Sequence, residues 1–500
     1  MVDDDPAGTP DTHRAAVRGA ARNSAWGAVG AAIAAVLGFM LSVVVARVAG
    51  AHNAGLFFAG VAIVMISISV CTIGADTGLL RSLSRDRAVE DSRNLRALLR
   101  VGLLPVLGLA VLSGSLLVVF APAIASTLTG SNTEPATTLL QVAGIGVILG
   151  PLSQCLLQAT RGLGDVRPFV LLQQVGLPSV RVIAVVALAV AGVTSAPTLL
   201  AAWAVPFALS LLLAALAVRR RVLRHERAAG ILARPVTRAT ASDFWRFAAP
   251  RGLGGICSQG LLWSDVLIVA VLASPTVAAI YAAASRLATG GQIAIQAMRL
   301  GIAPQISAAF ASGHVERVSA LYRASTTWAV LLSWPIFLTL ALFPGVALSL
   351  FGPEFVAAET AMRILSVAMM VSVAVGNVGT VLLMSGHSGW SARNSALALG
   401  ANVALNIVLV PLYGATGAAI SWTAAIMVEN VLGLWLVRYR LKVIGHGQRF
   451  WVTIVLVVLV LSSVGLISGA TVDGDLAAML VHIGVSGALL GIVYGIRRMR

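Results

Sequence analysis

Long runs of apolar residues alternate with short polar segments along almost the whole chain. Each run is about as long as an α-helix must be to cross a hydrocarbon core of roughly 30 Å at about 1.5 Å per residue. Pro and Gly inside several runs are compatible with helix, because neighbouring helices can satisfy the backbone groups that a kink frees. We expect fourteen transmembrane helices: 25–48, 55–79, 101–122, 136–160, 168–192, 196–218, 248–273, 276–299, 325–350, 361–386, 393–411, 414–437, 450–470 and 476–496.

The polar segments carry different charges on the two sides of the predicted membrane. Arg is concentrated in the even-numbered connections, with six in 81–100, eight in 219–246, and several more in 438–449. The odd-numbered connections hold acidic residues instead: Glu134, Glu354, Glu359, Asp473 and Asp475. Lys and Arg favour the cytoplasmic side of a membrane protein, so we expect both termini in the cytoplasm.

Composition supports a polytopic membrane protein, since 58% of the residues are hydrophobic and only 11% are charged. The net charge of +16 does not indicate nucleic-acid binding, because the basic residues lie between apolar runs and not on a soluble face. Cys71, Cys155 and Cys257 lie in or beside apolar runs without metal-ligand spacing, so we expect no disulfide, metal site or cofactor. Residues 1–24 lack the apolar core of a cleavable signal and are expected to form a cytoplasmic tail.

Two charges lie far inside predicted helices near the middle of the chain. Asp265 is in the helix predicted for 248–273, and Arg286 is in the next one. Ionisable residues within a membrane are costly and usually functional. Both lie at a similar distance from the turn that joins their helices. Asp265 could therefore hold Arg286 as a structural pair, or Arg286 could be available to a ligand.

The chain also contains an internal repeat with an offset of 224 residues, which aligns 54–59 with 278–283 and Gly162 with Gly386. The repeat predicts two six-helix lobes related by a pseudo-twofold axis along the membrane normal. The expected domains are a tail, an N-terminal lobe, a basic cytoplasmic linker, a C-terminal lobe and two additional helices: 1–24, 25–218, 219–246, 247–437 and 450–496. Transporters built from such repeats bind substrate between the halves.

Several motifs carry a resemblance that spans almost the whole chain. They lie at 46–63, 72–85, 263–288, 302–307, 349–355 and 401–422. The last is the most specific, with Asn-x-x-Leu-Asn, Pro-x-Tyr-Gly and Gly-Ala-Ala in succession. The sequence resembles the polysaccharide-exporting flippases of the multidrug, oligosaccharidyl-lipid and polysaccharide exporter superfamily.

The resemblance implies an all-α fold with fourteen transmembrane helices in the bacterial cell membrane. It also implies a flippase activity that moves a polyprenyl-pyrophosphate-linked oligosaccharide, a polysaccharide repeat unit, from the cytoplasmic to the outer leaflet. A polysaccharide polymerase and glycosyltransferases are the implied protein partners. The two last helices, 450–496, would border a groove for the polyprenyl tail.

A pyrophosphate-linked substrate needs fixed cations in a polar cavity, and the fork of Arg matches phosphate oxygens. The candidate substrate-binding cations are Arg286, Arg181, Arg47, Arg251 and Arg363. Arg286 and Arg181 are near mid-span, and Arg181 has no evident acidic neighbour. Arg47, Arg251 and Arg363 lie close to span ends, where a side chain can also reach the interface without binding substrate.

Three carboxylates are candidates for coupling or pairing: Asp265, Glu429 and Asp76. Glu429 lies about eight residues inside a predicted span and could be protonatable, or it could be kept neutral by burial. Asp76 is near the cytoplasmic end of its span and close to Arg81, which favours an interfacial ion pair.

Two other transport functions stay open. A lipid II flippase would need the same pyrophosphate chemistry. A multidrug or cation antiporter of the same superfamily would need acidic residues in its cavity, whereas 25–46 is free of charge and the mid-membrane charges are mostly Arg. An enzyme is disfavoured, because the short outer loops contain no cluster of nucleophile, base or metal ligands.

Overall fold

The computed structural model describes residues 10–88, 94–129, 133–229, 236–445, 447–472 and 474–498. Within these ranges the chain forms helices and no strand, which confirms the predicted all-α fold class. Residues 1–9 of the predicted tail and 230–235 of the predicted linker lie outside the described residues. The elements are α1 (Pro10–Thr72), α2 (Ala75–Ala88), α3 (Leu95–Val119), α4 (Ala121–Thr129), α5 (Glu134–Gly162), η2 (Phe169–Gly176), α6 (Leu177–Val190), α7 (Ala196–Ala204), α8 (Pro206–Ala229), α9 (Arg238–Leu272), α10 (Pro275–Gly290), α11 (Ile293–Ala311), α12 (Val315–Leu342), α13 (Pro344–Ser349), η3 (Pro353–Ala358), α14 (Glu359–Val375), α15 (Val378–Met384), α16 (Ser388–Trp435), η4 (Leu436–Arg440), α17 (Gln448–Thr471) and α18 (Asp475–Arg498).

The chain is a multi-pass membrane protein. Nine helical stretches of the described residues are long and apolar enough to cross a bilayer. Two of these stretches bend sharply where a glycine adopts a left-handed conformation, at Gly50 in α1 (φ 70°) and at Gly414 in α16 (φ 54°). Each of these bent helices covers two predicted crossings. The total of fourteen crossings stays a prediction.

Several predicted spans are broken into separate helices, and three of the breaks have a clear local cause. The predicted span 276–299 ends as α10 at Gly290, and α11 begins after a turn at Gly291, where an added Cβ would lie 2.5 Å from Phe337. The predicted span 361–386 breaks at Gly376, whose φ of 87° favours glycine. α7 and α8 are separate because Pro206 has no backbone N–H to donate.

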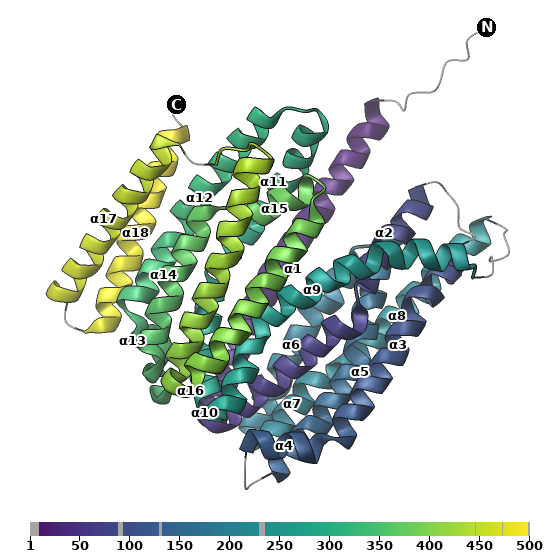
Figure 1. The fold of residues 1–500 in the computed structure, drawn as a ribbon, viewed down its shortest axis with the longest axis horizontal. Helices are drawn as coiled ribbons and strands as arrows, with labels where there is room; N and C mark the ends of the chain where they lie inside the picture. The colour runs from purple at the N-terminus through teal and green to yellow at the C-terminus, as the bar shows by residue number, and fades with distance from the viewer. Residues whose placement is uncertain are drawn as a thin grey trace.

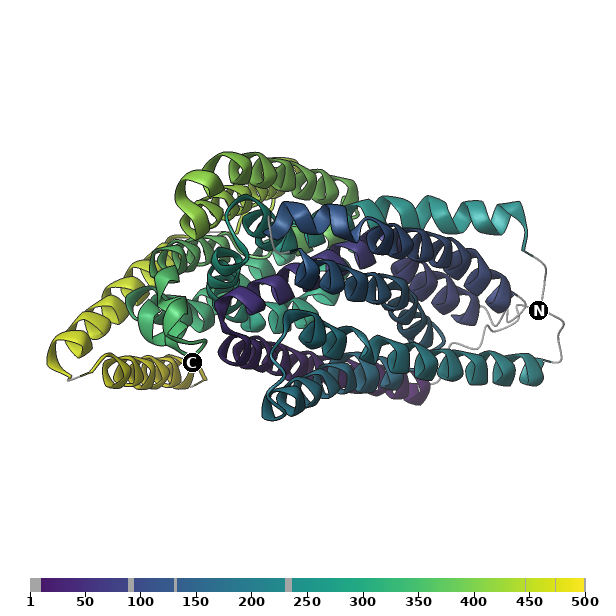
Figure 2. The same ribbon diagram turned by 90° about the horizontal axis from the view of Figure 1, so that it is seen from below.

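Figure 1 shows α2 to α8 gathered on one side of the molecule and α10 to α16 on the other. α1 and α9 pack against helices of both groups. Phe244, near the start of α9, packs with Leu79 and Leu98 of the first group, whereas the remainder of α9 packs along α16. Figure 2 shows α17 and α18 at the outer edge of the second group, where both contact α12. The lobe boundaries stay a prediction.

A set of close contacts joins α1, near its bend, to the second group. Arg47 Nε donates a hydrogen bond to Leu350 O (2.7 Å), and its Nη2 donates to Ser349 O (3.1 Å). The backbone N–H of Ala51 donates to Glu354 Oε2 (3.1 Å). Gly55 is in such close contact with α10 that an added Cβ would lie 1.7 Å from Pro275 O. The first turns after the bend in α1 are therefore fixed to the second group.

Candidate functional site

A cavity of about 510 Å³ lies among α1, α6, α7, α9 and α10. Its wall is mainly apolar and aromatic, and it includes Phe57 and Phe58 of α1. Two positively charged side chains line it, Arg181 from α6 and Arg286 from α10. The structure therefore brings together the two arginines that the sequence placed near mid-span.

Arg181 is buried, with 7% of its surface exposed. Its Nε donates a hydrogen bond to Trp203 O (2.8 Å), and the guanidinium lies 3.9 Å from the centre of the Trp203 ring. Phe207 lies on the same guanidinium at 4.6 Å. The Nη2 atom is buried and has no hydrogen-bond partner among the residues that the structure describes. An unpaired buried N–H group is costly, so an anion in the cavity would be stabilised there.

Arg286 is partly buried, and its guanidinium lies 4.1 Å from the centre of the Trp263 ring of α9. Thr289, one turn later on α10, lines the same cavity and donates its hydroxyl to Ser285 O (2.8 Å). Both arginines of the cavity thus have their guanidinium group over an indole ring. This arrangement leaves the N–H edges of a guanidinium available for hydrogen bonds.

Asp265 and Arg286 have different partners from the ones the sequence suggested. Asp265 is buried and accepts hydrogen bonds from Tyr281 Oη (2.8 Å) and Asn406 Nδ2 (2.7 Å). Residues two apart on a helix point about 200° away from each other. Trp263, which contacts Arg286, and Asp265 therefore lie on opposite sides of α9. The carboxylate belongs to a polar cluster with α10 and α16 outside the arginine cavity.

The remaining arginine candidates do not line this cavity. Arg47 joins α1 to the second helix group by donating to backbone carbonyls, as described above. Arg363 is exposed and forms an ion pair with Glu359 (3.1 Å) one turn away on α14. Arg251 is exposed on α9 and lies 5.5 Å from the ring centre of Phe247.

Asp76 also differs from expectation. Its Oδ1 accepts a hydrogen bond from the N–H of Thr77 (2.7 Å), and its Oδ2 accepts one from Gln154 Nε2 (3.2 Å). Arg81, the expected partner, lies instead over the ring of Phe247 at 3.9 Å. Asp76 lies in the first turn of α2, where a negative charge is favourable, and the N–H of Thr77 and the amide of Gln154 each donate to one of its oxygens.

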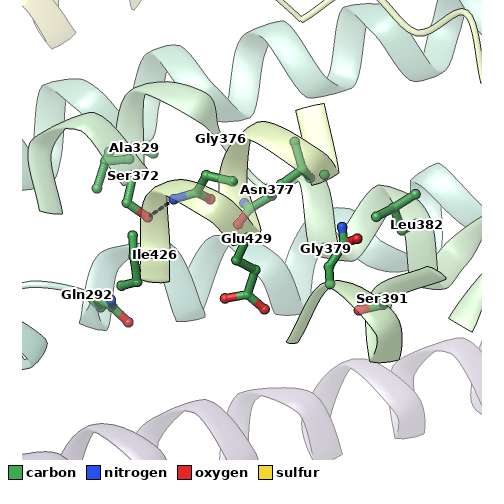
Figure 3. A pocket seen from close by; sticks show the side chains of 15 residues that line it. Gln292, Ala329, Ser372, Gly376, Asn377, Gly379, Leu382, Ser391, Ile426 and Glu429 are labelled. Atoms are coloured by element: carbon green, nitrogen blue, oxygen red, sulfur yellow. Dashed lines mark hydrogen bonds between the residues drawn. The ribbon is translucent and has the colours of Figure 1, made fainter. Parts of the chain in front are cut away.

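Glu429 lines a second, polar cavity of about 220 Å³ among α12, α14, α15 and α16. Figure 3 shows its carboxylate in this cavity together with Gln292 and Asn377. Ser395 Oγ donates a hydrogen bond to Glu429 Oε1 (2.7 Å). Glu429 is therefore neither paired with a cation among the described residues nor enclosed in an apolar environment.

Sequence reasoning missed the aromatic residues that cover the arginines. Trp203 and Trp263 had no assigned role, since a single Trp in an apolar run gives no sign of its contacts. Asn402 and Asn406 were noted only as part of a motif and given no role, although their spacing of four on an apolar helix places both amides on one face. That spacing was a usable signal of a buried polar cluster.

Comparisons with known proteins agree with this architecture. A family model described as "Polysaccharide biosynthesis protein" matches residues 20–310. A curated relative from Haloferax volcanii, "Probable low-salt glycan biosynthesis flippase Agl15", is 24% identical over 191 residues. That match covers 38% of this chain, and the chain spans only 40% of the length of the relative.

Two solved structures have a similar fold. One is titled "Lipid II flippase MurJ, inward closed conformation", with a TM-score of 0.72 at 12% identity, covering 94% of this chain and 99% of the other. The second is an inward-facing multidrug resistance transporter of the MATE family, with a TM-score of 0.66 at 16% identity, covering 82% of this chain and 94% of the other. At this level of identity the similarity concerns the fold.

Proposed function

Since the chain belongs to the polysaccharide biosynthesis protein family, we propose that it is a flippase for a polyprenyl-pyrophosphate-linked oligosaccharide. It moves this substrate from the cytoplasmic to the outer leaflet by alternating access. The observation that carries the proposal is the meeting of Arg181 and Arg286 in one cavity. The name of the Haloferax volcanii relative supports the same class of substrate.

The pyrophosphate is the part of the substrate that this cavity suits best. Two guanidinium groups can neutralise its charge, and the unpaired Nη2 of Arg181 supplies a donor that is already desolvated. Trp203 and Trp263 hold the guanidinium planes in place, so less side-chain entropy is lost on binding.

The size and lining of the cavity limit what else it holds. A volume of about 510 Å³ accommodates a pyrophosphate and a few attached groups, but not a whole lipid-linked oligosaccharide. The apolar wall formed by α1, with Phe57 and Phe58, suits the first isoprenoid units or the apolar faces of a sugar. The rest of the lipid and of the glycan would extend out of the cavity.

The proposal includes the arrangement of the chain in the membrane. The lobes 25–218 and 247–437 rock against each other, the segment 219–246 is a cytoplasmic linker, and 450–496 borders the lipid tail. Both termini are cytoplasmic. This is compatible with Figure 1, in which the first turns of α1 and the last turns of α18 lie at the same end of the molecule.

The positive charge of the cavity bears on the two alternative functions, a cation antiporter and a lipid II flippase. A cationic drug would be repelled by Arg181 and Arg286, so the cavity disfavours a cation antiporter. Lipid II carries the same pyrophosphate, and the similarity of fold to MurJ fits a flippase of that kind. The two possible flippase substrates differ in their glycan, which would be bound outside the cavity that contains the two arginines.

The proposal is tested by lipid binding to the full chain in nanodiscs, measured by native mass spectrometry. Undecaprenyl pyrophosphate should bind at least tenfold more tightly than undecaprenol. The double variant Arg181→Gln, Arg286→Gln should lose this preference, whereas Arg363→Gln, an exposed arginine outside the cavity, should keep it. Equal binding of the two lipids by the unmodified protein would refute the proposal. Adding lipid II and a lipid-linked repeat unit as competitors then distinguishes the two flippase readings.

A further inference from the structure

The second cavity, among α12, α14, α15 and α16, has a lining that suits a molecule rich in hydroxyl groups. Four of its lining side chains are carboxamides: Gln292, Asn377, Asn394 and Asn430. A carboxamide both donates and accepts hydrogen bonds, as does each hydroxyl group of a sugar. Asn430 Nδ2 donates to Ser372 Oγ (3.0 Å), which is the dashed line in Figure 3 and fixes the orientation of this amide.

Glu429 adds a negative charge to this lining. Ser395 Oγ donates to its Oε1 (2.7 Å), and no Lys or Arg forms an ion pair with it within the described part of the chain. In Figure 3 the carboxylate and the amide of Gln292 point to the same side of the cavity, toward the purple ribbon of α1. A carboxylate accepts short, strong hydrogen bonds from hydroxyl groups. It is therefore suited to hold a neutral polyol, and it repels an anionic one.

The cavity also has apolar walls. They include Ala329 of α12, Val373 of α14 and Ile426 of α16. A pyranose ring needs both kinds of surface, because its edge carries hydroxyl groups and its faces carry C–H groups. The volume of about 220 Å³ equals that of about seven water molecules at about 30 Å³ each. One sugar ring displaces about this much water, and a second ring would not fit.

We propose that this cavity binds one neutral pyranose, the sugar attached directly to the pyrophosphate of the substrate. The amides and the carboxylate hold its hydroxyl groups, and the charge of Glu429 disfavours uronic acids and other acidic sugars. The choice of this sugar rests on the proposed function, in which the pyrophosphate lies at Arg181 and Arg286. The sugar site itself is testable without that function.

The turn between α10 and α11 brings the two cavities close together. Thr289 and Gly290 line the arginine cavity, and Gln292 lines the polar cavity two residues later. Consecutive Cα atoms are about 3.8 Å apart, so the two linings come within about 8 Å of each other at this turn. The first sugar of a pyrophosphate-linked glycan is bonded to the phosphate itself. A pyrophosphate in one cavity therefore places that sugar next to the other.

Gln292 is held in a position that suits this role. Its Nε2 donates a hydrogen bond to Met369 Sδ (3.4 Å), so its carbonyl oxygen is left to accept from a sugar hydroxyl. The preceding residue, Gly291, is packed so closely that an added Cβ would lie 2.5 Å from Phe337. This packing fixes the turn, and with it the distance between Gln292 and the arginine cavity.

The site is tested by native mass spectrometry of the full chain in nanodiscs with three synthetic lipids. These are undecaprenyl pyrophosphate, the same lipid carrying one glucose, and the same lipid carrying one glucuronic acid. The glucosyl lipid should bind at least fivefold more tightly than either of the others. Equal affinity for the glucosyl lipid and the bare pyrophosphate lipid would overturn the site. Equal affinity for the glucosyl and glucuronosyl lipids would overturn the preference for a neutral sugar.

Two variants separate the charge from the hydrogen bonds. Glu429→Gln keeps the size and removes the charge, so the preference for glucosyl over glucuronosyl lipid should fall at least threefold. Gln292→Met removes the amide, so the preference for glucosyl over bare lipid should fall at least threefold. Glu316→Gln and Gln305→Met make the same changes at exposed positions and should keep both preferences. If Glu429→Gln does not fold, Gln292→Met decides alone, and an unchanged preference in it would overturn the site.

A probe without lipid distinguishes this inference from the proposed function. Saturation-transfer NMR should detect binding of methyl α-glucoside to the unmodified protein in nanodiscs, with competition by glucose and a weaker signal for Gln292→Met. Binding of the glucoside without binding of undecaprenyl pyrophosphate would refute the proposed function and keep the sugar site. Binding of the bare pyrophosphate lipid, with neither a glucoside signal nor a preference for the glucosyl lipid, would refute the sugar site and keep the proposed function.

Discussion

Arg181 contacts Trp203 in two ways, by a hydrogen bond from Nε to the backbone carbonyl and by the position of its guanidinium over the indole ring. Both contacts depend on the planar, multi-donor guanidinium. The pair therefore fixes the direction in which the unpaired Nη2 points. A point charge of the same sign would not be held in this way.

Arg181→Lys should consequently impair recognition of the pyrophosphate although the charge is kept. We expect at least a tenfold loss of affinity for undecaprenyl pyrophosphate, measured by native mass spectrometry in nanodiscs. Arg363→Lys, at an exposed arginine, should leave affinity unchanged. Full affinity of Arg181→Lys would mean that the charge alone is sufficient at this position.

The hydrogen bond from Tyr281 to Asp265 should contribute to stability and not to substrate binding. Tyr281→Phe leaves a buried carboxylate oxygen without its donor, at a cost of about 1–3 kcal/mol. Thermal unfolding in detergent should shift to lower temperature, while affinity for the pyrophosphate lipid stays the same. Tyr413→Phe, at an exposed tyrosine, is the control. A loss of lipid affinity without a loss of stability would place Asp265 in the binding site instead.

Gly55 should be indispensable for the packing of α1 against α10. Gly55→Ala would place a Cβ 1.7 Å from Pro275 O, so the helices must separate, with a cost of about 1–3 kcal/mol. The measurement is the melting temperature of the purified protein together with its expression level. Gly108→Ala on α3 meets no atom within 4 Å and serves as the control. Equal melting temperatures would contradict the close contact.

The proposed topology is tested by labelling single cysteines in a variant that lacks Cys71, Cys155 and Cys257. A cysteine at Val236, which is exposed within the linker, should react only from the cytoplasmic side. One at Asp475, at the start of α18, should react only from outside. Labelling of Val236→Cys by an impermeant reagent added to intact cells would reverse the orientation.

Removal of 450–500 should affect the lipid tail more than the fold. α17 and α18 contact α12 at the outer edge, so the remaining helices keep most of their packing. We expect the truncated protein to insert stably and to bind short-chain polyprenyl pyrophosphates, with several-fold weaker binding of the undecaprenyl form. Equal binding of both chain lengths would exclude a role of these helices in handling the tail.

The helical architecture could be predicted because one physical effect, the transfer of apolar side chains from water to lipid, dominates it. A run such as 101–122 is too apolar to remain in water, and its backbone must form a helix in lipid. The breaks were harder to predict. Gly291 is packed closely against Phe337 and Gly376 has a left-handed φ, and neither property can be read from the apolar runs around these glycines.

The candidate site could be predicted only in part. The depth of Arg181 and Arg286 in their spans identified them, since depth follows from residue count. The partner of each charge could not be derived in this way. Asp265 lies near Arg286 in helix height, but its rotation about α9 directs it to Tyr281 and Asn406. Rotation about the helix axis is decided by packing between helices, which an unaligned sequence does not reveal.

At Gly50 and Gly414 two helices meet at a single non-helical residue, with no loop between them. By the proposed topology both bends face the outside of the cell. Two of the outer connections thus expose almost no flexible chain to proteases, to antibodies or to the receptor-binding proteins of phages. An epitope tag for surface detection would be tolerated better beside Asp475, at the start of α18, than at either glycine.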